Sequence, residues 1–96
     1  MNEDSLCVSA LRALRYNLSP KFRVISIDYP KSDVLDMILV ISKELTEDET
    51  QLAYNFCGEI KGDLVDLNYV NLQIIKYTGN IESAPKLKIL LYALYK

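Results

Sequence analysis

The pattern of apolar and polar positions predicts a sheet organised around an interior strand at residues 34–42. This stretch, Val-Leu-Asp-Met-Ile-Leu-Val-Ile-Ser, is the longest apolar run of the chain. Both of its alternating faces are apolar, apart from Asp36 and the terminal Ser42. A run this short, rich in β-branched residues and apolar on both faces is typical of a strand buried in the middle of a sheet.

A helix and a strand are predicted before this run. Apolar residues recur at helical spacing over residues 5–16, and Asn17 with the Ser19-Pro20 pair ends the helix, because the residue before a proline avoids helical geometry. Residues 22–29 then alternate as a strand. The four residues 30–33 form a turn, so this strand and the interior strand are expected to form a hairpin.

The second helix has the clearest local signature. Thr46-Glu47-Asp48-Glu49 is a capping box, in which Thr46 accepts from the amide of Glu49 and Glu49 reaches back to the amide of Thr46. A buried stripe follows at helical spacing: Leu52, Ala53, Phe56, Cys57 and Ile60. Gly62 stands where a left-handed residue after the helix would end it.

The end of the chain leaves two alternatives open. Residues 69–78 alternate as a strand and residues 79–85 form a loop, but residues 86–95 fit either a helix or a strand. We choose the strand, because two αββ halves then match and a hairpin with the preceding strand leaves fewer unpaired backbone groups. The predicted fold is a single α+β domain, 1–96, of order α-β-β-α-β-β, with a four-stranded antiparallel sheet and two helices.

This fold predicts an interaction surface. If both helices cover one face of the sheet, apolar side chains remain on the other face: Ile38, Val40, Leu90 and Tyr92. A monomer rarely exposes a contiguous apolar patch of that kind. We therefore expect the uncovered face or a sheet edge to contact a second copy or a partner.

Charge narrows the choice of partner and compartment. Thirteen acidic against eleven basic residues give a net charge of −2, so a direct nucleic-acid surface is not expected. The longest apolar run is far shorter than the ~20 residues of a membrane span. The chain begins with Glu3 and Asp4 instead of the basic segment of a secretory signal, which predicts a cytoplasmic protein.

The reactive residue types argue against an enzyme. The chain has no histidine, so the usual general base and the common nucleophilic triads cannot be built. Two cysteines fifty positions apart and no histidine exclude the usual zinc sites, and three glycines provide no phosphate-binding loop. No cofactor and no metal are expected.

Acidic residues gather around the second helix. Glu44, Glu47, Asp48 and Glu49 lie near its start, and Glu59, Asp63 and Asp66 lie near its end. Such a set can steer a basic partner by long-range attraction. The alternative is that the first group caps the helix and the others keep the protein in solution. Tyr54 on the same helix is expected to be exposed, and tyrosine is enriched at interfaces.

The order of motifs resembles one family. Residues 13–28, Ala-Leu-Arg-Tyr-Asn-Leu-Ser-Pro-Lys-Phe-Arg-Val-Ile-Ser-Ile-Asp, are similar to the opening of immunity proteins of bacterial contact-dependent growth inhibition systems. The similarity continues at Glu-Leu-Thr-Glu-Asp-Glu over residues 44–49, at Glu59 and at the closing Leu91-Tyr92. The family's usual ending with an arginine and a glutamate is absent, and Ala-Leu-Tyr-Lys stands there instead.

This resemblance implies a cytoplasmic antidote that binds the C-terminal toxin domain of a delivered effector, often an RNA-cleaving nuclease such as an RNase acting on tRNA. The toxin would be a basic protein domain, bound one to one. The residues expected to contact it are Glu47, Asp48, Tyr54, Glu59, Asp63 and Asp66. The main alternative is a dimeric, secretion-chaperone-like adaptor that holds an effector peptide, and a third possibility is a structural or regulatory module without a toxin.

Overall fold

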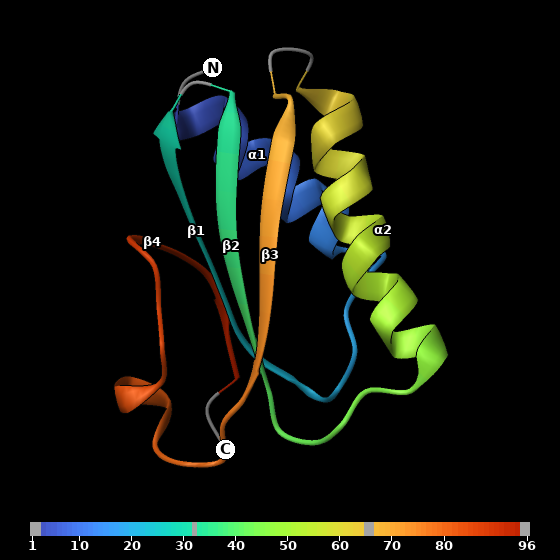
Figure 1. Ribbon diagram of the computed structural model, residues 1–96, viewed down its shortest axis with the longest axis vertical. Helices are drawn as coiled ribbons and strands as arrows, with labels where there is room; N and C mark the ends of the chain where they lie inside the picture. The colour runs from blue at the N-terminus through green and yellow to red at the C-terminus, as the bar shows by residue number, and fades with distance from the viewer. Residues whose placement is uncertain (1–2, 32, 65–66, 95–96) are drawn as a thin grey trace.

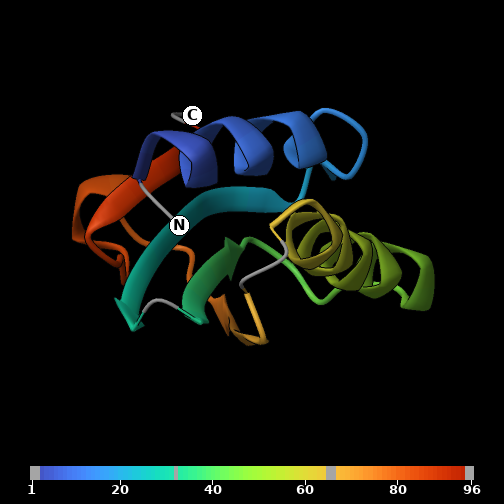
Figure 2. The same ribbon diagram turned by 90° about the horizontal axis from the view of Figure 1, so that it is seen from above.

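The computed structural model describes residues 3–31, 33–64 and 67–94, and its elements follow the predicted order. They are helix α1 (Glu3–Leu14), strands β1 (Phe22–Lys31) and β2 (Val34–Ile41), helix α2 (Glu47–Asp63), strand β3 (Tyr69–Lys76), the short 3-10 helix η1 (Ile81–Ser83) and strand β4 (Ile89–Ala93). Both helices lie on one side of the sheet (Figures 1 and 2). The α+β class is confirmed, as is a strand at the end of the chain.

The predicted all-antiparallel sheet is wrong, because the sheet is mixed. Its strand order is β3-β2-β1-β4. Strand β1 pairs antiparallel with both β2 and β4, as the hairpin predicts for β2, whereas β2 and β3 are parallel. Strands β3 and β4 therefore form no hairpin with each other and lie at opposite edges of the sheet (Figure 1).

Helix α2 is the reason for the parallel pair. Parallel neighbours need a crossover that returns the chain to the end where the first strand began. The 17 residues of α2 span roughly 25 Å. The eight residues of β2 extend over roughly 26 Å. One helix of this length returns the chain along the whole strand, so β3 enters the sheet in the same direction as β2.

The main core lies between the two helices and the sheet. It consists of alternating strand residues and the inner stripes of the helices: Leu6, Ala10, Ala13, Leu14, Phe22, Ile25, Ile27, Leu35, Met37, Leu39, Ile41, Ala53, Phe56, Ile60 and Leu67. Strand β2 is buried from both sides, as its apolar pattern predicts, since Val40 is fully buried on the opposite face.

The face of the sheet away from the helices is partly covered, which corrects the predicted open patch. The connection from β3 to β4 crosses this face and buries Ile81 and Ala84 against Val24 and Val40. Ser26 fixes the connection by accepting the backbone N–H of Leu87 at 2.8 Å.

Of the four residues predicted for the open patch, only one is largely exposed. Leu90 is exposed, Ile38 is half-buried, and Tyr92 packs against the main core on the helix side. Val40 is buried under the β3–β4 connection. A β4 strand paired with β1 needs this connection to span the sheet, and the span covers Val40 and packs against Ile38.

The helix ends differ in detail from the prediction. Helix α1 begins at Glu3 and ends at Leu14, two residues earlier at each end. Helix α2 continues through Gly62 to Asp63, and no described glycine has a positive φ. The helix instead ends at an extended Leu64, whose N–H bonds to the carbonyl of Ile60.

Candidate functional site

The capping box at the start of α2 forms as predicted. It engages Glu49 in hydrogen bonds within the protein, so this carboxylate is not free to contact a partner. The amide of Glu49 donates to Thr46 Oγ1 at 3.2 Å, and the amide of Thr46 donates to Glu49 Oε1 at 2.9 Å. Lys21 Nζ lies 2.6 Å from the same oxygen, and Ser19 Oγ donates to Oε2. The lysine and the Thr46 amide lower the pKa of Glu49 to about 2, so this carboxylate joins α2 to the start of β1.

Glu47 and Asp48 remain as the exposed acids of the first turn. Both side chains are exposed, and neither has an ion-pair or hydrogen-bond partner among the residues that the structure describes. Their charges complement the helix dipole and extend into solvent. They are therefore available to a basic partner at this end of α2.

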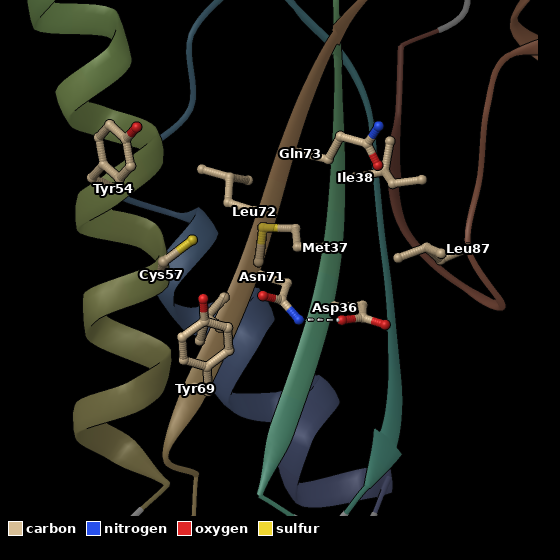
Figure 3. Close-up of a pocket in the computed structure, with 11 residues that line it drawn as sticks. Asp36, Met37, Ile38, Tyr54, Cys57, Tyr69, Asn71, Leu72, Gln73 and Leu87 are labelled. Carbon is tan, nitrogen blue, oxygen red and sulfur yellow. Dashed lines mark hydrogen bonds between the residues drawn. The ribbon is translucent and has the colours of Figure 1, made fainter.

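Tyr54 lies at a groove that runs around the edge strand β3. The tyrosine is 56% exposed, and the groove has a volume of about 530 Å³. Figure 3 shows the lining residues from both faces of the sheet edge, among them Cys57 of α2 and Tyr69 of β3. The floor on the far face contains a hydrogen bond of 2.9 Å from Asn71 Nδ2 to Asp36 Oδ1. We call this hollow the β3 groove.

Cys57 in the β3 groove is not a reactive thiol. Burial raises its pKa to about 11, so the thiolate that would act as a nucleophile is almost absent at neutral pH. The groove therefore provides contact area and hydrogen bonds, with Tyr54 and Tyr69 as its exposed aromatic side chains.

Glu59 and Asp63 face the other side of α2, toward α1. Asp63 lies nine positions after Tyr54. At 100° per residue, this places the two side chains on opposite sides of the helix. Glu59 and Asp63 line a hollow of about 360 Å³ between the helices. There Arg12 Nη1 lies 3.4 Å from Asp63 Oδ2, and Asn17 Nδ2 donates to Glu59 Oε2 at 2.7 Å. We call this hollow the α1–α2 groove.

Ser9 of α1 is a residue of this groove that the sequence analysis missed. The residue is 4% exposed, and its buried Oγ has no hydrogen-bond partner in the described parts of the chain. Leaving a buried hydroxyl unpaired costs about 1–3 kcal/mol. A sequence signal exists, because Ser9 lies three residues after Leu6 and four before Ala13, inside an apolar stripe.

The six predicted contact residues thus do not form one patch. Glu47 and Asp48 lie at the start of α2, Tyr54 at the β3 groove, and Glu59 with Asp63 at the α1–α2 groove. The sixth, Asp66, lies outside the described residues. The five described residues of this set are exposed, but they extend around three sides of α2, and their role as a contact surface stays a prediction.

Across residues 3–31, 33–64 and 67–94, no three cysteine or acidic side chains come together as metal ligands would. Within the same ranges, no helix has the length and apolar character needed to cross a membrane.

The fold and these surfaces define a class: a small α+β protein with exposed acidic side chains along α2 and exposed tyrosines on both α2 and β3. The family model described as MafI2 immunity protein matches residues 3–95. The chain belongs to the MafI2 immunity protein family. The resemblance to contact-dependent growth inhibition immunity proteins is confirmed at this level, because Maf toxin immunity is a polymorphic-toxin immunity system of that kind.

Other comparisons bear on the fold alone. A solved structure described as "MamM CTD - Copper form" is similar with a TM-score of 0.50 and 17% sequence identity, over 88% of this chain and 89% of that chain. At this identity the similarity shows a shared arrangement of helices and strands. Comparison with curated proteins finds no match.

Proposed function

We propose that residues 1–96 act as one domain that neutralises the C-terminal toxin domain of a contact-dependent growth inhibition effector by binding it in the cytoplasm, one to one. We propose further that the toxin is a basic nuclease, an RNase acting on tRNA. Membership of the MafI2 immunity protein family over residues 3–95 carries the proposal, since that family implies binding of a cognate toxin by an inhibitor that is not itself an enzyme.

The charges around α2 support a basic partner. A nuclease presents lysine and arginine side chains where it holds the phosphates of its substrate. Glu47 and Asp48 extend into solvent at one end of α2, and Glu59 is exposed at the other. Carboxylates placed in this way accelerate association with a basic domain and disfavour partners whose charges do not match.

The proposed contact set keeps the six residues expected from the sequence and assigns them to separate parts of one interface. Glu47 and Asp48 attract the toxin, and Tyr54 provides a large rigid side chain with few rotatable bonds at the β3 groove. Glu59 and Asp63 contact it across the α1–α2 groove, and Asp66 follows α2 in the sequence.

Affinity purification of the tagged protein from its own cells, followed by native mass spectrometry, tests the function. We expect a one-to-one complex with a basic fragment from the end of a very large protein, and loss of that fragment's toxicity when the two are co-expressed. A homodimer that holds a peptide of an otherwise harmless effector would instead support the adaptor alternative.

A charge-reversal experiment tests the placement of the interface. Glu47→Lys combined with Asp48→Lys should lower the association rate at least about ten-fold at low salt, because steering depends on these exposed charges. Glu82→Lys is the remote control, compared with the single variant Glu47→Lys of the same charge change, since Glu82 is an exposed acid in η1 on the opposite face of the sheet. Circular dichroism checks that each variant is folded. Equal rates for wild type and all three variants would contradict this placement and leave the function untouched.

A further inference from the structure

The α1–α2 groove adjoins a second hollow, and the two differ in their lining residues. One, of about 360 Å³, is lined by residues that include Tyr16 and Glu59. The other, of about 420 Å³, includes Asp4 and Val8. Ser9, Arg12 and Asp63 line both hollows, so they lie where the two meet.

The hydroxyl of Ser9 is the first feature that points to a ligand in this groove. Ser9 is 4% exposed, and its Oγ has no hydrogen-bond partner among the residues that the structure describes. Native proteins pair nearly all buried side-chain oxygens, so an unpaired one at the junction of two hollows marks a position where a partner's polar atom is expected.

The carboxylate of Glu59 is the second sign, because the protein fixes its position. Asn17 is buried, and its Nδ2 donates both to the carbonyl of Ala13 at 2.8 Å and to Glu59 Oε2 at 2.7 Å. The hydrogen bond to the Ala13 carbonyl orients the side-chain amide of Asn17. This amide in turn fixes the exposed carboxylate of Glu59 across the groove. The other oxygen of Glu59 has no partner among the described residues.

Two more groups complete the site. Tyr16 is 71% exposed at the edge of the first hollow and offers an aromatic face. Arg12 and Asp63 form an exposed ion pair at 3.4 Å, and pairs of this kind are weak enough to open when a competing cation arrives. Ser9 lines the same junction as this pair.

We propose that the α1–α2 groove receives an arginine side chain of the toxin. Its planar guanidinium donates to Glu59 and to Asp63 in place of Arg12, stacks on the ring of Tyr16, and gives one N–H to Ser9 Oγ. Arginine fits better than lysine, because its five fixed donors match a carboxylate pair and its flat face packs on an aromatic ring. The proposal rests on the proposed function, since it names the chemistry by which the toxin is recognised.

Binding of the cognate toxin domain to groove variants tests the proposal. Glu59→Gln keeps the shape and the Asn17 contact and should weaken the complex about 30-fold, as removal of one partner of a desolvated charge pair does. Ser9→Ala should weaken it about 3–10-fold through one lost hydrogen bond. Glu82→Gln is the matched control and should leave the affinity unchanged. A Glu59→Gln variant that binds like wild type would overturn the proposal while the function stands.

A second measurement needs no toxin. N-acetyl-arginine amide, added to the isotopically labelled full chain, should shift the NMR signals of Ser9, Arg12 and Glu59, and the uncharged citrulline analogue should not. The shifts should disappear in Glu59→Gln. Absence of shifts with wild type, or equal shifts with citrulline, would overturn the arginine site. A wild-type chain that binds arginine amide here but no toxin would instead refute the proposed function.

Discussion

Replacing Ser9 by alanine should make the free protein more stable. In most proteins a buried serine is hydrogen-bonded, and its loss is destabilising. Here the buried Oγ of Ser9 has no partner within residues 3–31, 33–64 and 67–94, so folding removes the hydration of a polar group without a compensating hydrogen bond. The substitution removes that unfavourable term.

The size of the effect follows from three contributions. Removing the unpaired hydroxyl recovers about 1–3 kcal/mol of desolvation cost, and alanine is favoured over serine inside a helix by about 0.5 kcal/mol. The small void left by one oxygen atom offsets part of this gain. We expect a net stabilisation of about 1 kcal/mol, which for a domain of this size raises Tm by about 4–8 °C.

Ser26→Ala provides the contrast within the same protein. Ser26 is also fully buried, but its Oγ accepts the backbone N–H of Leu87 at 2.8 Å. Its loss leaves that N–H without a partner and should destabilise the fold by about 1–3 kcal/mol. Urea unfolding, followed by circular dichroism, measures both variants. If Ser9→Ala is as destabilising as Ser26→Ala, then the Ser9 hydroxyl already has a hydrogen-bond partner in the free protein. That outcome would refute both the expected stabilisation and the arginine site.

Three further outcomes are expected. The lowered pKa of Glu49 adds stability that is present above about pH 4.5 and is lost as the pH falls toward 2. Glu49→Gln should therefore make the urea midpoint less dependent on pH in this range. Parallel curves of urea midpoint against pH for the two proteins would refute this linkage. With a pKa of about 11, Cys57 carries about 100-fold less thiolate than an ordinary thiol. In a Cys7→Ser variant, iodoacetamide should therefore modify Cys57 far more slowly in the folded protein than in the unfolded protein. Equal rates in the two states would contradict the burial of Cys57. Arg23→Gln removes the hydrogen bonds from the guanidinium to the carbonyls of Tyr77 at 2.6 Å and Gly79 at 2.9 Å. Amide hydrogen exchange should therefore accelerate in residues 77–88. An equal acceleration throughout the chain would show global destabilisation instead.

Local patterns predicted the elements well, because the interactions behind them are local. The capping box of Thr46 and Glu49 uses residues three apart, and it forms as read from the sequence. The apolar run of β2 is buried on both faces, as its composition requires. Gly62 failed as a helix-ending signal because one more residue, Asp63, remains helical and pairs with Arg12 fifty-one positions away.

The sequence suggested candidate contact residues but not how the fold arranges them. Tyr54 and Asp63 were grouped because they share a helix and its exposed sides, yet they face β3 and α1 respectively. Ser9 was missed because a serine inside an apolar stripe is usually paired, and only the arrangement of α1 against α2 leaves its oxygen without a partner.

The sequence by itself determined the order of elements, the buried stripes, the cap of α2 and the resemblance to immunity proteins, since each depends on residues close together in the chain. Only the tertiary structure decided that β3 lies parallel to β2, that β4 pairs with β1, and that the β3–β4 connection covers Val24 and Val40. These choices depend on contacts between residues far apart in the chain. Alternation along a strand shows which side chains share a face, but it does not show which neighbour the strand will pair with or in which direction.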